Sequence, residues 1–466
     1  MKASGLAAVA VLHLLATPAL AFESGSTGSD GALVPNVDTE VALPADGILN
    51  YTSINIPTGV TVRFLRNGLN TPVTLLVSGN ATIAGSIDVG GSAAPDSNGA
   101  GNGNIADDGL PGSGGPGGFP GGNGGKPDSV PANARVAQAG IGPGGGLPSP
   151  TTTAGCYGGS GSFGARGASS GCSSLQSIAY GNPDLLPMVG GSGGAGGNAH
   201  VNTGGGGGGG GGGALLIAVS GTLQVTGSIS ANGGAGGIVG NNYNEGGTPG
   251  GGGSGGGIRL VATTLSGNGA ITATGGRTGA WGNSATNVFG SVGRIRLEAE
   301  TFTRTAATNP PYTQGAPGSL VVTGIPTIRI ASVGGHDAPA EPTGNSDIIL
   351  PTDAPNPVAV GLAATHIPLG TTISVTVSPP HGAPVTTVSG GLQGSLDFST
   401  ATASVSLPEG PSVLLATLSF STTQTQQQAL SRYANGEPVM SVELAASANG
   451  EQRTILVTAT GRRIAL

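Results

Sequence analysis

Paired carboxylates are the residue pattern of this sequence that could do acid–base chemistry, and one adjacent pair occurs, Asp107 and Asp108. Two carboxyl groups held about 5–10 Å apart can act as acid and base on a glycosidic bond. Arg259, Arg294 or Arg296 would then bind the charge of an acidic sugar. The pair lies in a glycine-rich stretch, which is a poor mount for such geometry. We therefore interpret Asp107 and Asp108 as turn residues and keep an enzyme that uses them with Arg259 as an alternative.

Metal-binding and nucleophile motifs give weaker signals. The five histidines are isolated, without HxH or HExxH spacing, and they are His13, His200, His336, His366 and His381. The string Gly159-Ser160-Gly161-Ser162-Phe163 imitates a nucleophile motif, but such strings arise by chance where Gly and Ser are frequent. No GKS or GKT follows a glycine-rich loop. The sequence predicts a protein that is not an enzyme and that holds no metal or cofactor.

Cys156 and Cys172 are the two cysteines of the chain. Their spacing is not CxxC and no histidine lies nearby, which argues against a redox or metal pair. We expect a structural disulfide, because the chain carries an export signal.

Aromatic residues are scarce, yet six lie in or beside the glycine-rich stretches. Exposed aromatic side chains on a rigid surface commonly stack on sugar rings or anchor a partner. The alternative is that they pin glycine-rich segments together. The candidates for a binding surface are Tyr157, Phe163, Tyr180, Tyr243, Trp281 and Phe289.

The chain that must position these residues has an unusual amino-acid composition, rich in glycine and poor in charged residues. Gly accounts for 93 of 466 residues, whereas charged residues are 8% and the formal net charge is −7. Sixteen Lys and Arg without a basic run argue against a nucleic-acid partner.

Residues 1–21 read as an export signal. Lys2 begins it, an apolar run follows, and Ala19-Leu20-Ala21 fits a cleavage site. No stretch is long and apolar enough to be a permanent transmembrane segment. We expect a secreted or cell-surface protein of the bacterial extracellular space or outer envelope.

A repeat of short strands is visible in residues 22–320. Ile87, Ile229 and Ile271 each close a β-rich segment shortly before Gly-Gly, and each is preceded by a second apolar run: 72–78, 214–220 and 258–263. Such units bury a core by stacking, so we predict a parallel β-helix, or β-solenoid. The alternative is an antiparallel sandwich with the same insertions.

Glycine-rich insertions interrupt this repeat at 92–212, 235–255 and 277–292, and ten consecutive glycines occupy 204–213. Two interpretations stay open for them. Glycine disfavours order because it loses much backbone entropy on folding. Interleaved prolines, such as Pro111, Pro116 and Pro120, favour an ordered polyproline-II bundle, in which close backbones require glycine.

Residues 321–466 are of ordinary glycine content. Alternating strand-like runs separated by turns predict an antiparallel, immunoglobulin-like β-sandwich, with 424–433 as its one helix-compatible stretch. The joining stretch is expected at 309–318, where Pro and Gly cluster.

The stretches NYTSINIPTGVTVRFLRNGLNTPVTLLVSGNATIAGSIDVGG, AYGNPDLLPMVGGSGGAGG and GGGGGGGGGALLIAVSGTLQVTGSISANGG resemble uncharacterised exported bacterial glycine-rich β-solenoid proteins. The resemblance covers roughly residues 45–300. It implies a surface or secreted location and lends no catalytic residues. More distantly, the glycine blocks resemble polyproline-II bundles of phage tail-tip adhesins and antifreeze proteins.

The expected function is that of an extracellular or cell-surface structural or adhesive protein that presents a glycine-rich binding surface. Its expected partners are cell-surface polysaccharide, other surface proteins or further copies of itself. Besides the polysaccharide-active enzyme, an ice-binding protein is a weaker alternative, suggested by Thr-x-Thr pairs at 272–274 and 301–303.

Overall fold

The chain folds almost entirely into strands. The computed structural model describes residues 22–96, 109–126, 136–150, 156–199, 203–239, 247–281, 287–318, 320, 325–338, 348–379, 382–434, 437–447 and 452–465. In these ranges the strands form four sheets and α1 (Gln424–Ser431) is the one α-helix, which confirms the all-β expectation. The expected signal peptide, together with Asp107, Asp108, His200, Tyr243 and His381, lies outside the described residues.

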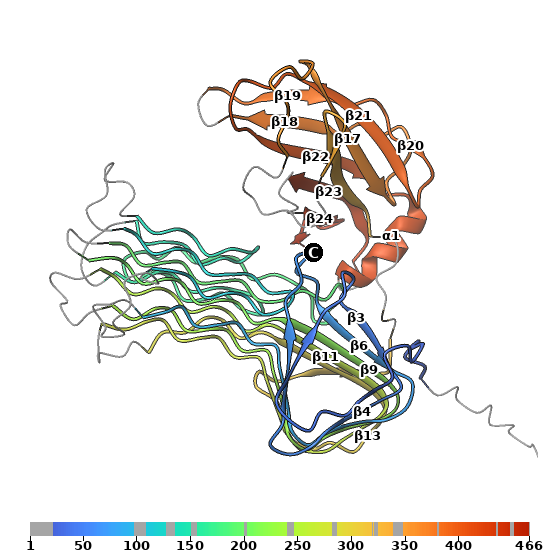
Figure 1. Cartoon of the computed structure of the whole chain (residues 1–466). Coiled ribbons are helices and arrows are strands. Elements are labelled where there is room, and N and C mark those ends of the chain that lie inside the picture. The colour runs from blue at the N-terminus through green and yellow to red at the C-terminus, as the bar shows by residue number, and fades with distance from the viewer. Residues whose placement is uncertain are drawn as a thin grey trace, which may run out of the picture.

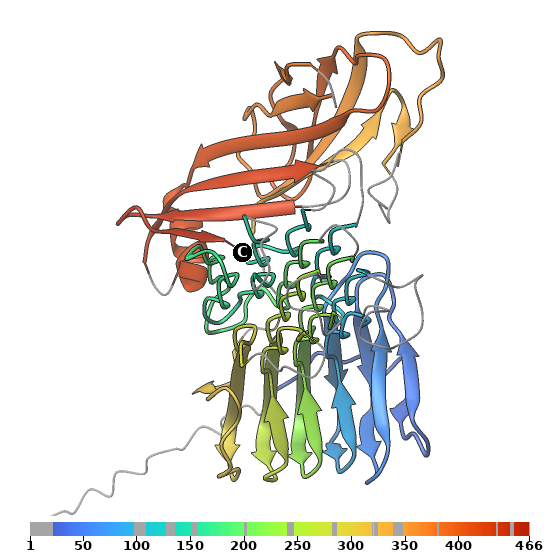
Figure 2. The same ribbon diagram turned by 90° about the vertical axis from the view of Figure 1, so that its left-hand side faces the viewer.

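Two parallel sheets form the N-terminal part, seen as side-by-side arrows in Figure 2. The nine-stranded sheet contains β1 (Ala32–Leu33), β3 (Ile48–Tyr51), β4 (Ser53–Ile56), β6 (Val73–Val77), β7 (Ala81–Ile83), β9 (Ala214–Val225), β11 (Gly257–Ser266), β13 (Arg294–Phe302) and β14 (Thr313–Gly315). The five-stranded sheet contains β2 (Thr39–Ala42), β5 (Thr61–Leu65), β8 (Ser86–Asp88), β10 (Ser228–Ser230) and β12 (Ala270–Thr272).

Equivalent positions of the sequence repeat stack on one another. Ile229 of β10 pairs with Ile87 of β8 on one side and with Ile271 of β12 on the other, always in parallel. The antiparallel alternative is therefore wrong for these strands. Because parallel neighbours place like residues side by side, each repeat adds one layer to a common core.

The core of this part is a set of apolar ladders. Leu75, Ile217, Leu260 and Leu297 pair in sequence across β6, β9, β11 and β13, and none of the four is exposed to solvent. Alternation with period two points every second residue of β6 inward. The strand-forming Val, Ile and Leu of the repeat thus form the inner wall.

Two antiparallel sheets form the C-terminal part, at the top of Figure 1. The five-stranded sheet contains β15 (Thr327–Val333), β16 (His336–Asp337), β17 (Val358–Thr365), β20 (Gln393–Gly394) and β21 (Ser399–Val405). The six-stranded sheet contains β18 (Ser374–Ser378), β19 (Val385–Val388), β22 (Val413–Ser421), β23 (Val439–Ser447), β24 (Gln452–Thr458) and β25 (Arg463–Ala465). Helix α1 and the 3₁₀ turn Arg432–Ala434 lie where the sequence predicted its one helix-compatible stretch.

The joining stretch differs from the expectation. Residues 313–315 form β14 and pair with β13, and Asn309 pairs with Thr272. These residues therefore still belong to the parallel sheets. Pro and Gly clustering marked irregular structure here, but it did not mark the end of the sheet.

Candidate functional site

The glycine-rich segments run side by side away from the parallel strands (Figure 1). Their centre is the run Gly204–Gly213, which forms backbone hydrogen bonds with six neighbouring described segments: 89–92, 112–115, 119–125, 191–197, 234–237 and 248–257. Buried peptide groups must be paired for such an arrangement to be stable. Ten glycines in a row therefore form an ordered centre and not a linker.

A period of three residues governs these hydrogen bonds. The N–H groups of Gly205, Gly208 and Gly211 donate to the carbonyls of Gly125, Gly122 and Phe119 at 2.8–3.0 Å. The N–H groups of Gly206, Gly209 and Gly212, each one residue further along, donate to the carbonyls of residues 248, 251 and 254. Each face of the segment thus contacts a different neighbour.

Close approach of the backbones explains why the central residues are glycine. A Cβ atom placed on any residue from Gly205 to Gly213 would lie between 1.7 and 2.6 Å from a backbone oxygen of a neighbour. Real Cβ atoms do not approach backbone atoms that closely. Any other residue would force two segments apart.

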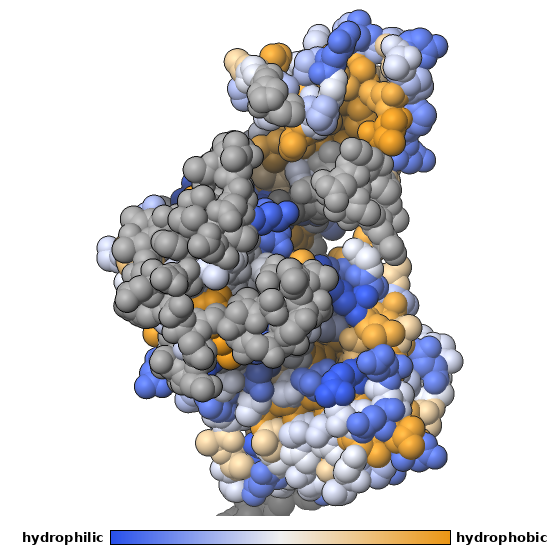
Figure 3. Space-filling view, turned by 60° about the vertical axis from the view of Figure 1, so that its left-hand side comes forward, coloured by the Kyte–Doolittle hydropathy of each residue, from blue (hydrophilic) through white to orange (hydrophobic). Residues whose placement is uncertain are grey.

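Side chains project from the outer segments, again at spacing three. Leu110 and Ser113 are exposed on one outer segment, and Phe289 and Val292 on another, with Phe289 51% and Val292 38% exposed. On the face of the molecule drawn in Figure 3, the hydrophobic surface of the described residues forms separate patches. The glycine-rich body therefore offers single side chains on a backbone scaffold.

Two of the six aromatic candidates are buried, which corrects their assignment to an exposed binding surface. Phe163 is 0% and Tyr180 is 6% exposed, and their ring centres lie 4.8 Å apart. The Tyr180 hydroxyl donates to the Gly190 carbonyl at 2.6 Å and accepts from the Ser192 hydroxyl at 2.9 Å. Burial raises the pKa of this phenol, so it stays neutral. These two rings hold glycine-rich segments together.

Three of the other four aromatic candidates lie in the described part of the chain, and they differ in exposure. Phe289 is exposed, and Tyr157 and Trp281 are half-buried. Trp281 pairs through its backbone with Val239, and Phe289 with Arg277. Tyr243 lies outside the described residues. Phe289 is thus the candidate with the best access to a partner.

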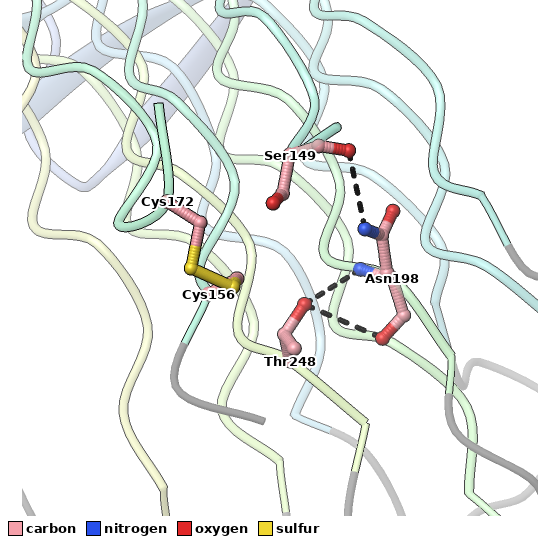
Figure 4. Close-up of a disulfide and its surroundings, with 5 residues drawn as sticks. All are labelled: Ser149, Cys156, Cys172, Asn198 and Thr248. Atoms are coloured by element: carbon pink, nitrogen blue, oxygen red, sulfur yellow. Dashed lines mark hydrogen bonds between the residues drawn. A yellow bond between two sulfur atoms is a disulfide. The ribbon is translucent and has the colours of Figure 1, made fainter. Parts of the chain in front are cut away.

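The expected disulfide joins Cys156 to Cys172, with their Cα atoms 5.1 Å apart (Figure 4). Beside it, the backbone N–H of Asn198 donates to the Thr248 hydroxyl at 2.6 Å, and the Asn198 amide donates to the Ser149 carbonyl at 3.2 Å. The disulfide closes a local loop, whereas the buried polar contacts of Asn198 join segments about 50 residues apart in sequence.

Replacing both cysteines with serine is expected to lower the free energy of unfolding by about 3 kcal/mol, because the bridge between residues 16 apart in sequence restricts the unfolded chain. Thermal unfolding with and without reductant measures this. A wild-type protein whose midpoint does not change on full reduction would contradict a stabilising role.

The arginine candidates are engaged in structural contacts. Arg259 is 1% exposed, and its Nε and Nη2 atoms donate to Glu298 at 3.0 Å each. Arg296 Nε donates to the same carboxylate at 3.1 Å, and Arg294 donates to the Tyr180 carbonyl. Burial alone would raise the pKa of Glu298, but Arg259 and the other donors hold it below its ordinary value. Sequence reasoning missed Glu298, because it lies 39 residues from Arg259.

A row of aligned side chains across the five-stranded parallel sheet argues against the ice-binding alternative. Arg63, Asp88, Ser230 and Thr272 pair in sequence across β5, β8, β10 and β12. Arg63 Nε lies 3.4 Å from Asp88 Oδ2. A charged pair therefore occupies a position where an ice-binding face would need a repeated threonine.

In the described part of the chain, no group of three or more His, Cys, Asp or Glu side chains could hold a metal ion. No helix among the same residues has the length and apolar character needed to cross a membrane. No protein-family model, curated protein or solved structure matches this chain.

Proposed function

We propose that the protein is an exported structural or adhesive protein of the cell surface or extracellular matrix. In this proposal residues 22–320 form a β-solenoid whose insertions make a polyproline-II bundle, followed by an immunoglobulin-like sandwich. The register of β8, β10 and β12, the three-residue hydrogen-bond period and the antiparallel C-terminal sheets support these assignments.

The observation that carries the proposal is the interior of the glycine-rich body. From Gly205 to Gly213 no Cβ has room, and backbone hydrogen bonds connect the run to its neighbours. This interior offers no side chain to bind or transform a ligand, and its backbone groups are paired with those of neighbouring segments. It can act as a stiff support for what its outer segments present, such as Phe289.

The polysaccharide-active enzyme is less well supported. It needs an arginine such as Arg259 in an open groove with Asp107 and Asp108. Arg259 is buried against Glu298, and Arg294 and Arg296 also make structural hydrogen bonds. A guanidinium held in this way does not bind a substrate carboxylate without first losing its partner.

Fractionation of a producing culture tests the proposed location. We expect the mature chain in the envelope or in sheared high-molecular-weight material. Recovery of the whole pool as free monomer in the medium would overturn the structural and adhesive role.

Sedimentation with isolated envelopes tests the presented surface. Phe289→Ser is expected to weaken binding about fivefold, as expected for loss of an aromatic anchor. Phe398→Ser is the matched control, because Phe398 is similarly exposed, at 55%, on the C-terminal part. Equal loss in both variants would place the contact elsewhere and contradict a role for the glycine-rich surface.

A further inference from the structure

A cavity of about 390 Å³ lies between the glycine-rich part and the C-terminal sheets. One wall is the segment 178–182, and the other comes from β24, β25 and the 3₁₀ turn after α1. Figures 1 and 2 both place the end of the chain beside this junction. Its volume falls in the range of small-molecule sites, about 300–1,000 Å³.

Three arginines line this one cavity: Arg453, Arg462 and Arg463. They stand out because the whole sequence holds only 16 Lys and Arg and has a formal net charge of −7. Most of the molecule would repel an anion, whereas this junction gathers positive charge.

Two of these arginines already have carboxylate partners. Arg462 Nη2 lies 3.2 Å from Glu437 Oε1 and donates to the Ala434 carbonyl at 3.1 Å. Arg463 pairs with Glu443 across β23 to β25, and Nη1 donates to Glu443 Oε1 at 2.6 Å. These contacts hold the two guanidinium groups in place and balance their charge.

Arg453 differs from its two neighbours. Its side chain is exposed, and within the described residues no ion pair or side-chain hydrogen bond engages it. One positive charge at the cavity is therefore uncompensated. A guanidinium fork binds a carboxylate through two parallel hydrogen bonds, and it does so more strongly than a neutral donor.

Apolar walls flank these charges. Ile455 and Ile464 line the same cavity, together with the buried Tyr433. A small inorganic anion would leave such walls uncovered. A sugar ring that carries a carboxylate would place its C–H groups against them and its charge on Arg453.

We propose that this junction binds a uronic acid unit of an acidic polysaccharide, with Arg453 as the residue that pairs with its carboxylate. The choice of a saccharide rests on the proposed surface location, whereas the need for an anion rests on the arginines alone. One wall belongs to the segment anchored through Tyr180 to Gly190, so the ligand would contact the glycine-rich part and the C-terminal sheets together.

Calorimetry on the purified full chain tests the site with three probes: a galacturonic acid trisaccharide, a neutral galactose trisaccharide and inorganic phosphate. We expect binding of the acidic trisaccharide alone, and a loss of about tenfold or more in Arg453→Gln. Arg329→Gln is the control, because Arg329 is an exposed arginine of β15 that does not line the cavity, and this variant should bind as the wild type does.

Equal binding of phosphate and the acidic trisaccharide would reduce the junction to a general anion site and overturn the saccharide assignment. No binding of the acidic trisaccharide, or binding unchanged in Arg453→Gln, would overturn the site itself. These measurements use purified protein and do not depend on where the chain is found in a culture. Failure here is therefore distinguishable from failure of the proposed surface role.

Discussion

Gly208→Ala is expected to disrupt the glycine-rich body and lower the free energy of unfolding by about 3 kcal/mol or more, at the upper end of overpacking effects. The added Cβ would lie 2.0 Å from the Gly194 carbonyl oxygen and 2.6 Å from its carbon. No side-chain rotation relieves a clash between two backbones. Relief requires the central segment to separate from its neighbour, which breaks the hydrogen bonds they share.

Thermal unfolding followed by circular dichroism, together with limited proteolysis, measures this effect. Gly390→Ala is the control, because a Cβ at Gly390 meets nothing within 4 Å and the residue does not have a positive φ. We expect that control to match the wild type or to gain about 0.4–1 kcal/mol from reduced unfolded-state entropy. A Gly208→Ala variant as stable and protease-resistant as Gly390→Ala would show that the glycines are not closely packed.

Glu298→Gln is expected to cost about 3–5 kcal/mol, the usual effect of removing one partner from a buried ion pair. Glu298 is 2% exposed and receives hydrogen bonds from Arg259, Arg296 and the Gly318 backbone. Without the carboxylate, the buried Arg259 guanidinium loses its ion pair with Glu298 and the two charge-assisted hydrogen bonds of that pair.

Two comparison variants separate this effect from a general loss of charge. Glu443→Gln breaks a pair with the exposed Arg463 and should cost far less than Glu298→Gln, because solvent screens an exposed ion pair. The double variant Arg259→Met with Glu298→Leu removes both buried charges and should recover most of the lost stability. Denaturant unfolding gives all three values, and equal costs at Glu298 and Glu443 would contradict the structural role of the buried pair.

Lowering the pH should weaken the ion pair between Glu298 and Arg259 and so lower the stability of the protein. The pKa of Glu298 is lower in the folded protein than its ordinary value of 4.5. The stabilisation is therefore complete above pH about 5 and is lost as the pH falls through 4.5 toward the folded-state pKa. The wild type should lose stability on acidification more steeply than Glu298→Gln, in which this group does not titrate. Parallel pH profiles for the two proteins would contradict the assignment.

The strands could be predicted because their signal is local. Ile87, Ile229 and Ile271 recur with the same neighbours, and the structure pairs them directly. Order in the glycine-rich segments could not be decided from sequence, since glycine serves both flexible chains and close packing. A periodic sign was present: side chains such as Phe289 and Val292 recur at spacing three on an outer segment.

Contacts between residues that are separated in the sequence could not be predicted from the sequence. Arg259 meets Glu298 only because β11 and β13 are neighbours in one sheet, and Phe163 meets Tyr180 only inside the folded glycine-rich body. Aromatic type alone did not distinguish Phe163, which is buried, from Phe289, which is exposed. The disulfide was predictable, since the chain has two cysteines and its first 21 residues have the pattern expected of an export signal.

Amide hydrogen exchange of peptides covering residues 204–213 tests the ordered glycine-rich body most directly. The N–H groups from Gly205 to Gly213, apart from that of Gly207, donate to carbonyls of neighbouring segments. Protection comparable to that of strands β9 and β11 is the expected result, because opening this centre requires several segments to separate. Exchange at the rate of an unfolded glycine chain under native conditions would contradict the account.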